Sequence, residues 1–280
     1  MSSTDPDAPP RPVSASFHGK VAIVTGAGSA GDGIGNGRAT AILLAEQGAA
    51  VVCVDRRQDW ADRTVEMIKA EGKGKAFAVL GDVTSAKDCE NVVQQAVSTF
   101  GHLDILINNV GIYGATGTAV EVDMDDWAKG MELNVASLVL MSKYAIPEMR
   151  KNQGPVRGSI VNMGSVGGLR GGSPTLLYPT SKGAVVNMTR AMAAHHAPDG
   201  IRVNCVCPGM LYTPMMYAGG MSEEVRDARR KRSLLQTEGS GWDAGCAVRF
   251  LASGEARWMT GTILTVDAGT TATTSSVPAP

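Results

Sequence analysis

Short runs of consecutive apolar residues alternate along the chain with longer stretches whose apolar positions recur at helical spacing. The short runs are rich in β-branched residues and predict seven strands, at Val21–Thr25, Ala50–Val54, Ala76–Leu80, Ile105–Ile107, Ser159–Met163, Arg202–Val206 and Ile263–Val266. The longer stretches predict helices at Gly37–Gln47, Trp60–Glu71, Lys87–Phe100, Trp127–Arg150, Thr180–His196 and Trp242–Ala252. Strands and helices are therefore expected to alternate.

This alternation predicts an α/β fold, with a doubly wound parallel seven-stranded sheet and helices on both faces. Apolar strands need cover on both faces, and right-handed crossover helices supply it. A single domain is expected over residues 17–270, because composition does not change within that range. Residues 1–16 and 271–280 are expected to be flexible tails, since they are too polar or Pro-rich to bury a core. Residues 212–241 are too long for an ordinary connection and are predicted to form an irregular lid.

The composition of the 280 residues excludes several classes of partner. A formal charge of −1 gives no electrostatic reason to expect nucleic acid or an anionic membrane surface. No segment has the ~18 uninterrupted apolar residues of a membrane span, and the N-terminus lacks a signal-peptide pattern. The five cysteines are scattered, which favours reduced thiols, and the Cys205–Cys207 pair lacks partners at zinc spacing, so no metal site is predicted. A cytoplasmic protein is expected.

Glycine is unusually frequent, with 34 residues, and many of the glycines fall directly after the first predicted strand. That strand continues into Gly-Ala-Gly-Ser-Ala-Gly-Asp-Gly-Ile-Gly-Asn-Gly, residues 26–37, and a helix follows. Bare backbone N–H groups and a helix N-terminus suit the pyrophosphate of a dinucleotide. Two glycine pairs could allow the backbone to approach the pyrophosphate closely, one in Gly33-Ile34-Gly35 and one in Gly35-Asn36-Gly37, and both alternatives remain open.

The end of the second predicted strand indicates which dinucleotide is bound. Asp55 lies where a carboxylate can accept both adenosine ribose hydroxyls and would repel a 2′-phosphate, which favours NAD. Arg56 and Arg57 follow at once, and an arginine could instead pair with the phosphate of NADP. We therefore expect NAD, with NADP as the open alternative.

Tyr178 and Lys182 carry the candidate chemistry. Their spacing places phenol and ammonium on one helix face. A neighbouring cation favours phenolate, so Lys182 is expected to lower the pKa of Tyr178 toward the range in which it exchanges a proton near neutral pH.

In this context the chain resembles the short-chain dehydrogenase/reductase family over residues 17–270, and the resemblance implies a Rossmann fold that binds NAD(P). The motifs that carry the resemblance are the glycine loop, Gly-Asp-Val, Asn-Asn-Val-Gly, Leu-Asn-Val, a serine thirteen residues before Tyr178, and a Pro-Gly turn that ends in threonine. The implied catalytic residues are Asn134, Ser165, Tyr178 and Lys182. The implied cofactor-binding residues are Gly26, Gly33, Ile34, Gly35, Asp55, Asp82, Val83, Asn109, Gly111, Tyr178, Lys182, Pro208, Gly209, Leu211 and Thr213.

The resemblance also implies roles for these residues. Ser165 would hydrogen-bond the substrate oxygen, Tyr178 would give or take its proton, and Lys182 would also hold the nicotinamide ribose. Asn134 would anchor a proton-relay water, and Thr213 would orient the carboxamide. Two departures from the family pattern stand out: the cofactor loop is lengthened, and Met163-Gly164 precedes Ser165 where the family usually has a small hydroxyl residue.

The implied function is hydride transfer between a nicotinamide cofactor and a secondary alcohol or ketone, in a homo-oligomer that is a tetramer or dimer. Methionines in the lid favour an apolar alicyclic, aromatic or terpenoid-like substrate. The basic run Arg226–Arg232 is interpreted as a solvated helix face, with contact to an acidic substrate as the alternative. Two other functions remain open: a non-catalytic nicotinamide sensor, and an enzyme that catalyses a further dehydration or epimerisation.

Overall fold

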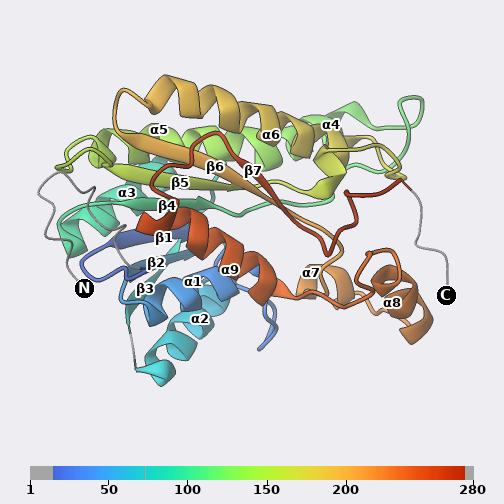
Figure 1. Cartoon of the computed structure of the whole chain (residues 1–280), viewed down its shortest axis with the longest axis horizontal. Helices are drawn as coiled ribbons and strands as arrows, with labels where there is room; N and C mark the ends of the chain where they lie inside the picture. The colour runs from blue at the N-terminus through green and yellow to red at the C-terminus, as the bar shows by residue number, and fades with distance from the viewer. Residues whose placement is uncertain (1–14, 73, 275–280) are drawn as a thin grey trace, which may run out of the picture.

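The described residues of the computed structural model, 15–72 and 74–274, contain one sheet of seven parallel strands (Figure 1). The strands are β1 (Val21–Thr25), β2 (Ala50–Asp55), β3 (Lys75–Leu80), β4 (Ile105–Asn108), β5 (Gly158–Met163), β6 (Ile201–Pro208) and β7 (Ile263–Val266). Their order in the sheet is β3-β2-β1-β4-β5-β6-β7, and every neighbouring pair is parallel. The predicted fold class is confirmed. The order reverses between β1 and β4, so a crevice opens outside the carboxyl ends of these two strands.

Helices cover both faces of the sheet (Figure 1). One face carries α1 (Asn36–Glu46), α2 (Gln58–Glu71) and α9 (Gly241–Ala252). The other face carries α3 (Ala86–Phe100), α4 (Met124–Met131), α5 (Ser137–Met149) and α6 (Leu177–His196). Local signals fix their ends: Ser85 caps α3 by accepting from the Asp88 amide, and Gly101 ends it in the left-handed conformation, with φ of 90°.

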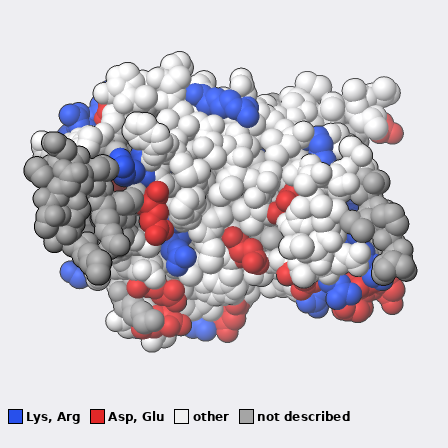
Figure 2. Space-filling view, in the orientation of Figure 1, with Lys and Arg blue, Asp and Glu red and all other residues white. Residues whose placement is uncertain are grey.

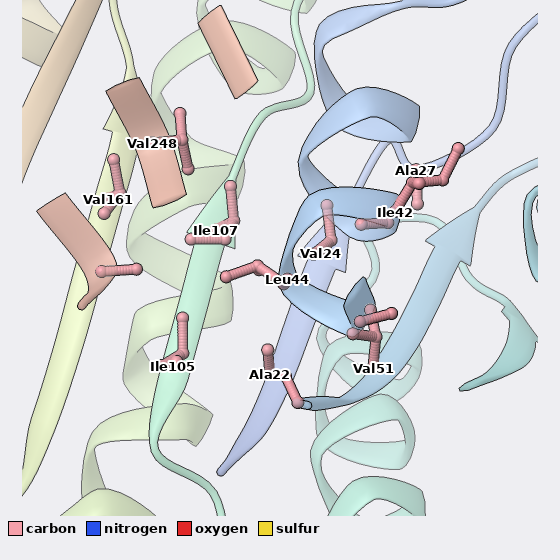
Figure 3. Packing of buried hydrophobic residues seen from close by; sticks show 14 of the residues in the cluster. Ala22, Val24, Ala27, Ile42, Leu44, Val51, Ile105, Ile107, Val161 and Val248 are labelled. Carbon is pink, nitrogen blue, oxygen red and sulfur yellow. The ribbon is translucent and has the colours of Figure 1, made fainter. Parts of the chain in front are cut away.

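Two apolar cores follow from the alternation of side chains along each strand. Val24 and Ile107 face the first core, where they pack with Leu44 of α1 and Val248 of α9 (Figure 3). The preceding residue of each strand, Ile23 and Leu106, faces the second core, which is completed by α3, α5 and α6. Each central strand is therefore buried on both sides, which accounts for its uninterrupted apolar sequence.

Two predicted elements differ from the structure. The helix expected at Trp127–Arg150 begins earlier, at Met124, and contains a π-helical turn, Glu132–Ala136, between α4 and α5. Residues 212–241, expected to be irregular, contain two short helices, α7 (Pro214–Tyr217) and α8 (Glu223–Arg230), and their role as a lid stays a prediction. Local capping explains why these two helices form: Pro214 opens α7, and the Ser222 hydroxyl accepts from the Val225 amide at the start of α8.

The predicted tails lie mostly outside the described residues, and their flexibility stays a prediction. At the boundaries that are described, Phe17 is buried, and Thr271 donates its amide and hydroxyl to the Asp267 carboxylate at 2.8 and 2.7 Å. Within the described ranges, none of the helices combines the length and the apolar character needed to cross a bilayer.

Candidate active site

A cavity of about 840 Å³ lies at the carboxyl edge of the sheet. Its walls come from the loops that follow β1 to β6, together with residues of α1, α6, α7 and α8. Asp55 and Asp82 line one end, whereas Ser165 and Tyr178 line the other. The strand order thus brings together, in one elongated cavity, residues that are far apart in the sequence.

Most predicted cofactor-binding residues line this cavity. They are Gly26, Gly35, Asp55, Asp82, Val83, Asn109, Gly111, Tyr178, Lys182, Pro208, Gly209, Leu211 and Thr213. Gly33 and Ile34 do not line it, whereas Asn36 and Gly37 do. The first turn of α1 approaches the loop so closely that a Cβ on Gly37 would lie 2.0 Å from the Gly26 carbonyl oxygen. This geometry favours the register Gly35-Asn36-Gly37. No side chain caps α1, which leaves its first N–H groups available to an anion.

A fully buried arginine, Arg38, organises the lengthened loop. Its Nη1 donates to the carbonyls of Gly31 and Gly33, both at 2.7 Å, and its Nη2 donates to the carbonyl of Ser29 at 2.9 Å. Its remaining N–H groups reach α2, at the Thr64 hydroxyl (2.9 Å) and the Trp60 carbonyl (3.4 Å). All five guanidinium donors are therefore satisfied. The extra loop residues form a shell of carbonyls around Arg38, which lies in a stretch that the sequence reading treated only as helix.

Asp55 ends β2 with its carboxylate at the cavity. Its two oxygens accept from the amides of Gly28 and Arg57, each at 3.0 Å, while burial raises its pKa. The Arg57 side chain turns away and pairs with Asp59, with 3.0 Å between Nη2 and Oδ2. Of the two arginines considered for NADP, only Arg56 lines the cavity.

Ser165 and Tyr178 meet at the opposite end of the cavity. Ser165 follows β5 and is 9% exposed; its hydroxyl accepts from the Gly167 amide at 3.1 Å and lowers the pKa of Tyr178 against the effect of burial. A turn of 3₁₀ helix at 166–168 packs against α6 because Gly168 has no side chain; a Cβ there would lie 2.4 Å from the Lys182 carbonyl carbon. This close contact holds the serine loop against the helix that carries the tyrosine.

The unusual Gly164 before Ser165 has a packing reason. A Cβ at this position would lie 2.7 Å from the sulfur atoms of both Cys205 and Cys207. These buried thiols occupy the space that a hydroxyl residue would need. The departure from the family pattern is therefore compensated on β6.

Lys182 does not act on Tyr178 as expected from the sequence. Its ammonium is buried and donates to the Met163 carbonyl at 2.9 Å, while its Nζ lies 5.8 Å from the centre of the Tyr178 ring. Burial lowers the pKa of Lys182 to about 8 and raises the pKa of Tyr178. The expectation that Lys182 lowers the pKa of Tyr178 is wrong for this structure, because desolvation of the phenol outweighs a cation that is bound elsewhere.

Asn134 lies behind the cavity, in the π-helical turn, and is not one of the residues that line it. Its amide forms a closed pair with the backbone of Ile112: Oδ1 accepts from the amide and Nδ2 donates to the carbonyl, both at 2.8 Å. Nδ2 also donates to the Ser181 hydroxyl at 3.0 Å, which in turn donates to the Tyr178 carbonyl. The side chain thus ties the loop after β4 to α6.

Sequence reasoning missed Tyr113. Its ring lies 4.8 Å from that of Tyr178, and its hydroxyl donates to the Met216 sulfur at 2.7 Å, so it joins the candidate proton donor to α7. No motif singled it out, since it follows the Asn-Asn-Val-Gly turn in an irregular loop. Arg170 was missed as well, and it also lines the cavity.

No group of three or more His, Cys, Asp or Glu side chains in the described part of the chain is placed to hold a metal ion.

Comparison with known proteins gives consistent matches over nearly the whole chain. Residues 28–271 match the family model described as enoyl-(acyl carrier protein) reductase. A meso-2,3-butanediol dehydrogenase of Serratia marcescens is 37% identical, over 91% of this chain and 96% of the relative. Among solved structures, a Burkholderia xenovorans protein provisionally described as a short-chain dehydrogenase/reductase is 40% identical with a TM-score of 0.85, over 92% of this chain and 99% of that one. A 7α-hydroxysteroid dehydrogenase, solved with NADH and 7-oxo glycochenodeoxycholic acid, is 34% identical with a TM-score of 0.83, over 91% and 95% of the two chains.

Replacement of Arg38 by Met is expected to lower the free energy of unfolding by about 3 kcal/mol, because it leaves buried carbonyls without donors. Urea denaturation measures this change. Arg63→Gln is the matched control, since Arg63 pairs with Asp32 of the same loop but at the surface, and its loss should change stability by less than about 0.5 kcal/mol. Equal effects of the two variants would show that the carbonyl shell does not depend on Arg38.

Lys182→Met is expected to stabilise the protein at pH 7. The unfolded lysine keeps its proton up to about pH 10.5 and the folded one only to about 8, so below pH 8 the buried charge costs about 3 kcal/mol. Loss of the bond to the Met163 carbonyl offsets about 1 kcal/mol of that. Urea denaturation should therefore show a gain of about 2 kcal/mol at pH 7 that shrinks as the pH rises from 8 to 10. A variant less stable than the wild type at pH 7 would contradict the assigned cost.

Proposed function

The chain belongs to the short-chain dehydrogenase/reductase family and is a nicotinamide-dependent alcohol dehydrogenase or ketone reductase, and from this premise we propose that it uses NAD(H). The observation that carries the proposal is the shared cavity, in which Ser165 and Tyr178 lie at one end and Asp55 at the other. A dinucleotide is the ligand that would span both ends.

The residues present fit such a cofactor. The uncapped start of α1 and the bare backbone of Gly35 and Gly37 suit a pyrophosphate. The Asp55 carboxylate, which already accepts two backbone amides, retains lone pairs for ribose hydroxyls and would repel a 2′-phosphate. With Arg57 paired to Asp59, only Arg56 favours NADP, and we propose NAD on this balance.

The cofactor, when bound, supplies or accepts the hydride. In ketone reduction the Tyr178 hydroxyl gives its proton to the carbonyl oxygen, and its raised pKa keeps that proton in place at neutral pH. The Ser165 hydroxyl lies beside it and donates a hydrogen bond to the same oxygen as negative charge develops there. Lys182 lies next to Gly111, where a Cβ would be 2.9 Å from its Nζ, and we assign it to the nicotinamide ribose.

The carbon skeleton of the substrate is proposed to be apolar. Met210, Leu211, Met215 and Met216 line the cavity beyond Tyr178. Methionine side chains adapt to irregular shapes, which suits an alicyclic, aromatic or terpenoid-like secondary alcohol or its ketone.

Tyr178→Phe is expected to reduce kcat for cyclohexanone reduction on the order of 10³-fold, because the proton donor is lost. NADH absorbance follows the reaction. Tyr144→Phe removes a phenol hydroxyl on α5 outside the cavity and should leave kcat unchanged. Retention of wild-type turnover by Tyr178→Phe would refute the assigned role.

The wild-type protein is expected to bind NADH at least about ten-fold more tightly than NADPH, because the Asp55 carboxylate repels the additional phosphate. Titration followed by nicotinamide fluorescence gives both dissociation constants. Asp55→Asn keeps the shape but removes the charge, and should narrow the preference mainly by improving NADPH binding. Tighter NADPH binding by the wild type would instead assign the ribose site to Arg56.

A further inference from the structure

Three arginines line the far end of the cavity: Arg170, Arg229 and Arg232. The acidic residues that line the same cavity are Asp55 and Asp82, and both lie at the end assigned to adenosine. The end that receives the substrate therefore carries positive charge without an acidic neighbour in its wall.

The other basic residues of this region are neutralised, which sets these arginines apart. Acidic and basic side chains gather over α8 at one end of the molecule (Figure 2). The pairs formed there are Arg226 with Glu238 and Glu223, and Arg230 and Lys231 with Asp227. The Ser222 hydroxyl lowers the pKa of the remaining carboxylate of α8, Glu224. Among the described residues, no carboxylate lies within ion-pair distance of Arg170, Arg229 or Arg232.

Arg229 is the best placed of the three. It is half-buried, and its guanidinium makes one long contact, from Nη2 to the Leu211 carbonyl at 3.5 Å. Its charge lowers the pKa of Tyr113 against the effect of burial, and the Tyr113 ring packs against that of Tyr178 at a tilt of 38°. Glu238, which pairs with Arg226, lies beyond ion-pair distance of Arg229, although the Arg229 charge also lowers the pKa of Glu238. The Arg229 guanidinium thus lies near the reacting end of the cavity without a direct carboxylate partner. Arg170 is partly used, since Nη1 donates to the Thr270 carbonyl at 2.8 Å.

Guanidinium groups in the wall of a cavity that have no carboxylate partner there favour the binding of an anion. A guanidinium also presents a planar fork of donors that matches a carboxylate. We propose that the substrate is an oxo or hydroxy acid whose carboxylate is bound by Arg229, with Arg170 and Arg232 at the mouth of the cavity. This proposal rests on the proposed function and names the substrate class. The proposal assigns only part of the basic run Arg226–Arg232 to the substrate, because Arg229 and Arg232 are the residues of that run that line the cavity.

Pairs of ketones that differ only in charge test the proposal. Levulinate, 5-oxohexanoate and 3-oxocyclohexanecarboxylate are each compared with their methyl esters in NADH-dependent reduction at pH 7. For the best-fitting pair, the acid is expected to show a kcat/KM roughly 10- to 100-fold above that of its ester, and added salt should reduce the ratio. Esters that equal or exceed their acids in every pair would overturn the proposal.

Arg229→Gln is expected to lower the ratio of acid to ester kcat/KM toward one, because the partner of the substrate carboxylate is lost. Arg230→Gln is the matched control: it removes a neighbouring guanidinium of α8 that pairs with Asp227 and does not line the cavity. It should leave the ratio unchanged. An unchanged ratio in Arg229→Gln, or an equal loss in Arg230→Gln, would show that general surface charge rather than Arg229 selects the acid.

A binding measurement separates this proposal from the proposed function. The same acids and esters are titrated into the complex with NAD⁺, which has no hydride to transfer to a ketone, and the heat of binding gives their dissociation constants without turnover. Tighter binding of an acid that disappears in Arg229→Gln supports the anion site even if no ketone is reduced, a result that would count against the proposed function alone. Equal binding of acid and ester, with both reduced, would overturn the anion site and leave the proposed function standing.

Discussion

The arrangement of this active site depends on one constraint: polar groups that the fold buries must find their partners within the protein. Arg38 is fully buried, and the glycine loop satisfies it by folding its carbonyls around the guanidinium. Asn134 is equally buried and satisfies itself on the backbone of Ile112. In both cases a side chain from a helix determines the path of a loop after a strand. The loops at the carboxyl edge are therefore held by groups that lie behind the cavity.

Lys182 is a buried polar group that the protein satisfies only in part. Its ammonium has one protein partner, the Met163 carbonyl, and its pKa falls as a result of burial. The fold thus retains a charge that is unfavourable for stability at neutral pH. A residue kept at such a cost fits a requirement of function rather than of folding. The contrast with Arg38, whose five donors are all occupied, separates a structural cation from one that is available to a ligand.

The sequence predicts much of this fold because both faces of the central strands are buried. Runs such as Val21–Thr25 are recognised as strands by their short length and β-branched residues, and motif spacing predicts that Ser165 and Tyr178 share one site. Features that depend on tertiary packing were out of reach. Arg38 looks like an ordinary helix residue until the loop is seen around it, and the π-helical turn at Glu132–Ala136 has no local signal. The pKa of Tyr178 could not be predicted from spacing either, because burial decides it. In α8, charge alternation suggested a solvated face, and only the cavity wall distinguishes Arg229 from Arg230.

The glycine loop and α7 touch at Gly33, where a Cβ would lie 2.5 Å from Pro214 Cγ and 2.8 Å from the Tyr217 hydroxyl. Gly33 lies outside the cavity, yet it supports the helix that carries Met215 and Met216 into the substrate end. The size of residue 33 therefore sets how closely α7 can approach the loop. A larger residue at position 33 would displace α7 and change the width of the substrate end of the cavity. Position 33 is therefore a site at which protein engineering can alter substrate selection without replacing a residue that contacts the substrate.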